Sequence, residues 1–194
     1  MIGGEAVLRS LVASNVDVVF ANPGTSEMHF VATLDAVPEM RGVLALFEGV
    51  ATGAADGDAR MRDSPAAVLL HLGPGLGNGL ANLHNARRSH APVVTIVGDH
   101  ATYHKKFDAP LESDIDTVAR NVSTWIRRSV HAEAAGSDAA AAVAAEACTA
   151  IWPEGKRRFN ETLVPSRAEI SSTTPFKWMS SGRKTCRRFC SFSI

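Results

Sequence analysis

The chain has 194 residues, of which 45% are apolar and 21% are charged, enough to bury one good hydrophobic core. It has no long uncharged apolar run and no basic N-terminal stretch followed by an apolar one, so we expect a soluble, cytoplasmic protein with no membrane contact. The formal net charge is zero, which gives no electrostatic support to a nucleic-acid partner.

The zero net charge is the sum of two unlike parts. Residues 1–150 hold 11 basic and 17 acidic side chains, whereas residues 151–194 hold 9 basic and 3 acidic ones. The second part offers too little apolar surface to offset the entropy of ordering. We therefore predict one domain over residues 1–150 and a basic, poorly ordered tail over residues 151–194. Cys186 and Cys190 have no histidine nearby, so no metal site is predicted there.

The chain begins with alternating helix-like and β-branched stretches. A helix is predicted over residues 4–14, and it leads into a strand over 16–21. Proline and glycine in the segment 22–27 end that strand and form a turn. A second helix over 28–37 and a second strand over 43–47 follow. This alternation is typical of a parallel α/β sheet.

The middle of the chain continues the same pattern. The segment 48–57 is rich in small residues, which let a helix pack closely. Residues 66–72 form an almost uninterrupted apolar run, as expected for a strand covered on both faces. A glycine-rich loop over 73–79 then precedes a helix that ends near residue 88, and a fourth strand is predicted over 93–97.

Beyond residue 100 the pattern weakens. A short helix over 115–120, a strand over 122–129 and an alanine-rich helix over 138–150 are predicted. A parallel sheet should then receive one more strand, but the segment after residue 150 is rich in Ser, Thr, Arg and Lys. We therefore predict an α/β fold with a doubly wound parallel sheet flanked by helices, its last strand missing.

Glu48 is the most informative single residue, because it lies at a strand exit between apolar segments. A carboxyl group there can exchange a proton with a ligand nitrogen near neutral pH. The alternative is a glutamate that only begins a helix, where the helix dipole favours negative charge. The local sequence leaves both interpretations open.

The segment 73–79 and the neighbouring His71 form a second group of candidates. A glycine loop between a buried strand and a helix lets a ligand approach the backbone, as in dinucleotide sites. However, Asn78 replaces the third glycine of the dinucleotide pattern, and Pro74 removes an amide donor. His71 lies near the end of the apolar run, where an imidazole needs a specific partner or an opening onto a cavity, although a lone histidine is more often structural.

Five features occur together in a characteristic order and spacing. They are Asn22-Pro23-Gly24-Thr25-Ser26-Glu27, Glu48 before Gly49-Val50-Ala51, Asp56-Gly57, His71, and Gly73-Pro74-Gly75 with Asn78. Over about residues 1–147 the chain resembles the N-terminal, pyrimidine-binding domain of thiamine-diphosphate enzymes, specifically the family of acetolactate synthase large subunits and benzoylformate decarboxylase. The resemblance implies the thiamine-diphosphate-binding fold.

The resemblance also implies roles for individual residues. Glu48 matches the glutamate that hydrogen-bonds the pyrimidine nitrogen N1′ of thiamine diphosphate and promotes activation of the cofactor. His71 matches a catalytic histidine that transfers protons in the decarboxylases, and Thr25 matches a serine that contacts the 2-oxo acid substrate. The other matched cofactor-binding positions are Pro23, Gly24, Gly75 and Asn78.

One element of the family is absent from the sequence. The Gly-Asp-Gly motif with a later Asn, which anchors Mg²⁺ and the diphosphate in a C-terminal domain, does not occur. We therefore expect a truncated chain that is inactive alone, with Mg²⁺ bound only when a C-terminal domain is supplied. The implied partner is a second copy of the chain or a separate diphosphate-binding chain. A non-catalytic remnant or subunit, and an unrelated nucleotide-binding protein, remain as alternatives.

Overall fold

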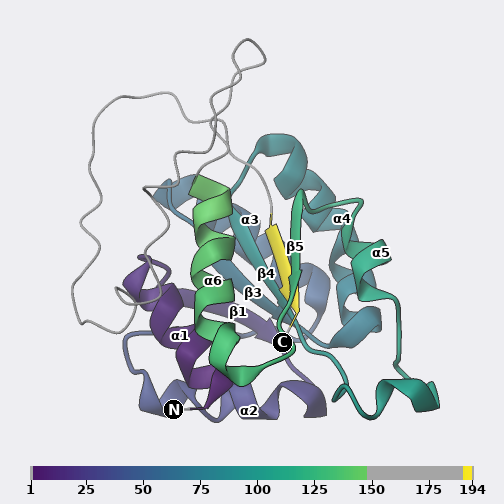
Figure 1. The fold of residues 1–194 in the computed structure, drawn as a ribbon. Coiled ribbons are helices and arrows are strands. Elements are labelled where there is room, and N and C mark those ends of the chain that lie inside the picture. The colour runs from purple at the N-terminus through teal and green to yellow at the C-terminus, as the bar shows by residue number, and fades with distance from the viewer. Residues whose placement is uncertain (1, 148–189, 194) are drawn as a thin grey trace, which may run out of the picture.

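The computed structural model describes residues 2–147 and 190–193. Its centre is a six-stranded sheet in the order β2-β1-β3-β4-β6-β5, and all neighbouring strands are parallel (Figure 1). The strands are β1 (Val18–Asn22), β2 (Arg41–Leu44), β3 (Ala66–Leu70), β4 (Val93–Val97), β5 (Trp125–Arg128) and β6 (Cys190–Ser193). The predicted α/β fold with a doubly wound parallel sheet is confirmed.

Helices connect successive strands and cover both faces of the sheet. The α-helices are α1 (Gly3–Ala13), α2 (Met28–Val31), α3 (Glu48–Arg62), α4 (Leu72–Ser89), α5 (Ile115–Ala119) and α6 (Ala132–Ala147). Short 3₁₀ turns are η1 (Thr25–Glu27), η2 (Leu34–Ala36) and η3 (Lys105–Phe107). Within the described residues, no helix is both long and apolar enough to cross a bilayer.

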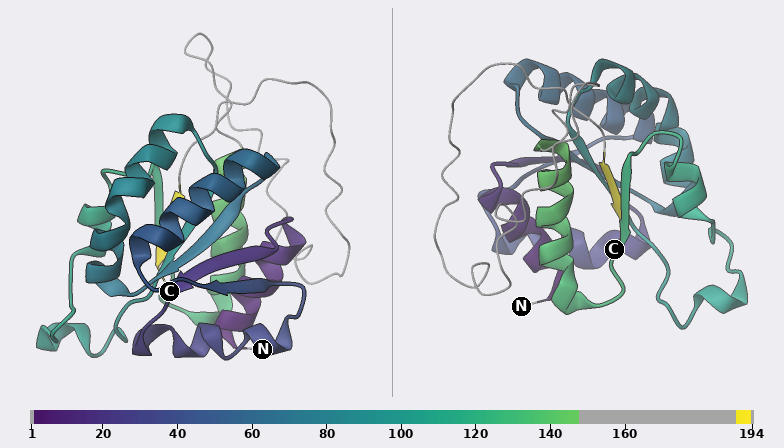
Figure 2. Two further views of the ribbon diagram at one scale, coloured as in Figure 1. Left: turned by 180° about the vertical axis from the view of Figure 1, so that it is seen from behind. Right: turned by 45° about the horizontal axis from the view of Figure 1, so that its top comes forward.

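The two faces of the sheet carry separate cores. Helices α1 and α6 pack side by side on one face, while α3 and α4 cover the other, as the front and back views show (Figures 1 and 2). Side chains in a strand alternate between faces, so Leu69 joins the core under α1, whereas Val68 and Leu70 join the core under α3 and α4. The sheet is thus the middle of three layers.

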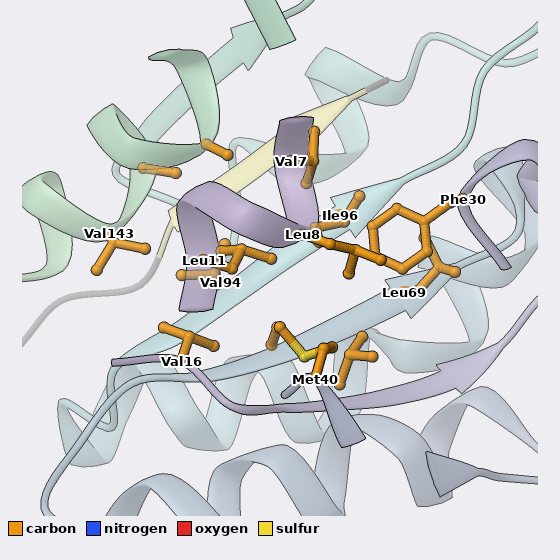
Figure 3. Close-up of a cluster of buried hydrophobic side chains, with 14 of the residues drawn as sticks. Val7, Leu8, Leu11, Val16, Phe30, Met40, Leu69, Val94, Ile96 and Val143 are labelled. Atoms are coloured by element: carbon orange, nitrogen blue, oxygen red, sulfur yellow. The ribbon is translucent and has the colours of Figure 1, made fainter. Parts of the chain in front are cut away.

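The core under α1 forms because apolar residues recur at helical spacing. Leu8 and Leu11 are fully buried, and they pack with Phe30 and with Val94 and Ile96 of β4 (Figure 3). Full burial of an aliphatic or aromatic side chain of this size contributes about 1.5–3 kcal/mol. This layer fixes α1 against the sheet and so fixes the start of β1.

The second predicted helix is interrupted. The pattern predicted one helix over 28–37, but the structure has α2 and then η2. The buried Thr33 hydroxyl donates to the Phe30 carbonyl at 2.6 Å. A side-chain bond of this kind competes with regular helical bonding, which accounts for the break between the two turns.

The glycine-rich segment is not a loop, and that prediction is wrong. Residues 73–79 form the first turns of α4, which begins at Leu72. Leu72 is buried and has φ 50°, a left-handed conformation that is strained for a branched side chain and turns the chain sharply from β3 into the helix. Pro74 lies within the first turn, where its missing N–H costs nothing.

The prediction that the last strand is missing is also wrong. β6 lies between β4 and β5 and pairs with both, with Phe192 opposite Ile96 and Arg127. The sequence Cys-Ser-Phe-Ser lacks the continuous apolar run expected of a central parallel strand, so its pattern does not predict a strand. The predicted boundary at residue 150 stays a prediction, because residues 148–189 lie outside the described part of the chain.

Candidate functional site

The candidate site lies at the carboxyl edge of the sheet, where parallel α/β folds place their ligands. β1 leads into Asn22 and the turn at Gly24, β3 leads into His71, and β4 leads into Gly98. Helix α3 begins at the same edge with Glu48. Residues from distant parts of the sequence therefore meet there.

Glu48 is the first residue of α3 and is half-buried. Its Oε2 accepts a hydrogen bond of 3.1 Å from Asn78 Nδ2. A Cβ at Gly75 would lie 3.4 Å from Glu48 Oε1 and 3.3 Å from His71 Cβ, so Gly75 lies between the two side chains. The structure thus brings together four of the predicted site residues: Glu48, His71, Gly75 and Asn78.

Side-chain amides hold the backbone around Glu48. Asn22 Nδ2 donates to the Ala45 carbonyl at 2.8 Å, and Asn82 Nδ2 donates to the Gly49 carbonyl at 2.6 Å. The buried Thr52 hydroxyl lies 2.9 Å from the Glu48 carbonyl one turn earlier in α3. These bonds fix the segment from β2 into α3, so the Glu48 carboxyl has a defined position.

His71 does not stand alone. It directly precedes α4, and its Nδ1 lies 2.7 Å from Glu27 Oε2. The same oxygen accepts the Gly24 backbone N–H at 2.7 Å. Glu27 is fully buried, whereas the His71 side chain keeps 20% of its surface exposed. The imidazole therefore has a buried acidic partner on one nitrogen and access to the sheet edge.

Sequence reasoning missed Glu27 as a site residue. It follows Gly24 by three positions, the spacing of a capping box, and such a glutamate is usually a surface cap. A local pattern carries no signal for complete burial. The relevant signal would have been His71, a histidine at the end of an apolar strand that needs a partner.

Two glycines leave room for this pair. A Cβ at Gly24 would lie 2.4 Å from the His71 Nδ1 atom, and a Cβ at Gly98 would lie 1.5 Å from Glu27 Oε1. Both distances are far below van der Waals contact, so any larger residue would displace the side chain. Gly24, predicted as a cofactor contact, is thus also required by the packing of His71.

The remaining predicted residues lie on the same turn without joining the cluster. Pro23 connects β1 to Gly24, and Thr25 begins η1 and is exposed. Within the described residues, no hydrogen bond connects the Thr25 hydroxyl to His71 or Glu48. Thr25 therefore belongs to the rim of the site.

A charged network borders the site beyond β4. Asp99 accepts bonds from Lys105 Nζ at 2.7 Å and from Arg128 of β5, and Lys105 also donates to Glu112. Burial opposes the charge on Lys105, but the hydrogen bonds with Asp99 and Glu112 outweigh it and raise the pKa of Lys105. The network ties the 99–112 segment to β5 of the sheet.

Comparisons with known proteins point to one family. The family described as thiamine pyrophosphate enzyme, N-terminal TPP binding domain, matches residues 1–120. Over 145 residues the chain is 72% identical to a Mycobacterium tuberculosis protein provisionally named acetolactate synthase large subunit IlvX, a match that covers 75% of this chain and 28% of the relative. It is 44% identical over 80 residues to benzoylformate decarboxylase of Pseudomonas aeruginosa, which covers 41% of this chain and 15% of that protein.

A solved structure shows the same fold. The thiamine diphosphate-dependent 4-hydroxybenzoylformate decarboxylase of Rhodococcus jostii RHA1 superposes with a TM-score of 0.75 at 21% identity, covering 100% of this chain and 30% of that one. The chain therefore spans less than a third of the length of each of these proteins.

Proposed function

Because the chain belongs to the thiamine pyrophosphate enzymes through their N-terminal TPP-binding domain, we propose that it supplies the pyrimidine-binding half of an active site acting on 2-oxo acids. The observation that carries the proposal is the Glu48 carboxyl, fixed at the start of α3 beside Gly75 and Asn78. A carboxyl at a sheet edge, next to a position with no side chain, suits a flat ring with a basic nitrogen.

The residues present fit the pyrimidine end of thiamine diphosphate. Glu48 Oε1 has no hydrogen-bond partner within the described residues, so it can hold a proton at the ring nitrogen N1′. Gly75 keeps the adjoining backbone open, Gly24 leaves the space that the His71 ring occupies, Pro23 shapes the turn, and Asn78 orients the carboxyl. When bound, thiamine diphosphate supplies the carbanion chemistry by which these enzymes attack a carbonyl carbon.

His71 and Thr25 would serve the substrate. A histidine with one nitrogen bonded to a buried carboxylate and part of its ring exposed can donate or accept a proton at the other nitrogen. The exposed Thr25 hydroxyl lies on the turn that carries Gly24, so we assign it to contact with the 2-oxo acid.

We further propose that the chain is inactive until a diphosphate-binding domain covers the Glu48 edge. Apolar residues flank Glu48 and are exposed: Leu44 by 70%, Leu46 by 90%, Phe47 by 49% and Val50 by 60%. A cluster of exposed apolar side chains beside a functional carboxyl is typical of a surface that another domain covers. That domain, on a second chain, would bring the Mg²⁺ and diphosphate contacts.

The proposal is tested by titrating the isotopically labelled chain with 4-amino-2-methylpyrimidine, the cofactor fragment that needs no diphosphate contact. We expect amide NMR shifts concentrated at Gly49, Gly75 and Asn78. Glu48→Gln should weaken binding at least tenfold, whereas Glu39→Gln, a change at an exposed residue, should not. Shifts with NAD and none with the pyrimidine would overturn the proposal in favour of a nucleotide-binding protein.

A further inference from the structure

We propose that Glu27 is the positioning residue of His71, holding the imidazole as the tautomer that carries its hydrogen on Nδ1 and presents an unprotonated Nε2. The inference rests on the proposed function, in which His71 transfers a proton. It assigns a task to a fully buried carboxyl that the pyrimidine site itself does not use. The tautomer matters because only the nitrogen without hydrogen can accept a proton from a reacting group.

The assignment of the donor follows from the chemistry of the groups that meet at Glu27 Oε2. Glu27 Oε2 accepts the Gly24 N–H at 2.7 Å, so this oxygen already acts as a hydrogen-bond acceptor toward one neighbour. His71 Nδ1 lies at the same 2.7 Å from this oxygen. An ionised carboxylate can only accept hydrogen bonds, so with Glu27 in that form Nδ1 is the donor. The neutral imidazole then has its lone pair on Nε2.

Capping alone does not account for the burial of Glu27. The residue closes a capping box on η1, a turn of only three residues. A surface cap keeps its carboxyl in water, whereas Glu27 is 0% exposed and its Oε1 has no hydrogen-bond partner within the described residues. Burial of a carboxyl is strongly unfavourable unless specific partners offset the loss of hydration. The partner supplied from across the sheet is His71, 44 positions later.

The surrounding backbone restricts the pair to one arrangement. Gly98 at the end of β4 leaves the space for Glu27 Oε1, and Gly24 after β1 leaves the space for the His71 ring. A Cβ at these positions would lie 1.5 Å and 2.4 Å from the respective side chains. Two separate strand ends thus confine the carboxyl and the imidazole, as expected for a positioned catalytic group.

The experiment measures the tautomer of His71 directly, from ¹⁵N shifts of the ring nitrogens in the full chain near neutral pH. In the unaltered chain we expect Nδ1 to carry the hydrogen. Glu27→Leu removes the acceptor and should move His71 to the Nε2–H form that is usual in water. Glu27→Gln keeps an acceptor of equal reach and should retain the Nδ1–H form. An unchanged tautomer in Glu27→Leu, or its loss in Glu27→Gln, would overturn the proposal.

A second variant covers the case in which Glu27→Leu does not fold. Gly98→Ala leaves Glu27 in place but displaces its carboxyl, and it should accelerate solvent exchange of the His71 Nδ1–H at least tenfold. Gly57→Ala is the matched control, because its Cβ would meet no atom within 4 Å. Equal exchange rates in both variants would overturn the proposal. The readout needs neither cofactor nor turnover, so it is independent of whether aminopyrimidine binds.

Discussion

Two glutamates at one sheet edge have different surroundings. Glu48 is half-buried and keeps one carboxyl oxygen without a partner in the described part of the chain, whereas Glu27 is fully buried against His71. The first arrangement suits contact with a ligand, and the second suits the holding of another side chain. The sequence identified Glu48 from its position at a strand exit, but it gave no sign of the burial of Glu27.

Glu48→Gln tests the proposed proton transfer. In an assembly with a diphosphate-binding domain from a homologous enzyme, the variant should still bind thiamine diphosphate through its diphosphate end. It should slow exchange of the cofactor's C2 hydrogen by about 10²–10⁴-fold, because the glutamine amide cannot transfer a proton to the ring nitrogen as a carboxyl group can. Exchange is measured by quenched-flow NMR. Glu39→Gln serves as the control, and unchanged exchange in Glu48→Gln would remove Glu48 from the mechanism.

At the scale of elements, periodicity predicted most strands and helices but not their ends. β4 occupies residues 93–97 as predicted, whereas β1 begins two residues later than predicted and β2 ends at Leu44. α6 begins at Ala132, before the predicted 138, since the 132–137 stretch is made of small residues and Glu133 and carries little periodic signal. Element ends depend on capping and on neighbours, which a repeat pattern does not encode.

The end of α1 gives a prediction at this scale. Asn15 has φ 62°, and the Val16 N–H bonds the Leu11 carbonyl at 2.9 Å, as in a Schellman ending. Asn15→Ala should lower the free energy of unfolding by about 1 kcal/mol, because alanine lacks the short polar side chain that makes this conformation tolerable for asparagine. Asn15→Gly should maintain or raise it, because glycine has no Cβ to oppose a positive φ. Urea denaturation measures both. The exposed Asn121 does not have positive φ, so Asn121→Ala is the control.

The whole molecule depends on pairings between distant segments. β6 joins β4 to β5, so the edge strand β5 is connected to the rest of the sheet through four residues near the C-terminus. The ion pair between Asp17, before β1, and Arg62, at the end of α3, likewise joins separate elements at 2.6 Å. Contacts of both kinds stabilise the fold as a unit.

Removal of β6 should destabilise the sheet. A chain shortened to residues 1–147 loses the strand between β4 and β5, which leaves two strands with unpaired edges. We expect a lower thermal midpoint and self-association, measured by calorimetry and analytical ultracentrifugation against the full chain. A shortened chain that is monomeric and melts at the same temperature would show that β6 contributes little.

Stability should also depend on pH through Asp17. The hydrogen bond from Arg62 lowers the pKa of Asp17 below its ordinary value of 3.8, with desolvation opposing it. A depressed pKa stabilises the folded state above pH 3.8, and this contribution is lost as pH falls through the lowered value. Asp17→Asn should therefore cost about 0.2–1 kcal/mol at neutral pH, since the pair is partly exposed, and nothing in strong acid.

Urea denaturation at several pH values checks this dependence, with the exposed Asp35→Asn as the control. A cost for Asp17→Asn that stays constant into strong acid would show that the ion pair is not its cause.

The sequence by itself determined the alternating α/β order, the parallel sheet, the place of Glu48 after the second strand and the resemblance to the thiamine-diphosphate enzymes, because periodicity and short motifs are local. The tertiary structure decided that 73–79 is helical, that residues 190–193 pair within the sheet, and that Glu27 meets His71. Each of these outcomes depends on contacts between residues that are far apart in the chain. The free energy gained when such residues pair and become buried produces no repeating pattern in the local sequence.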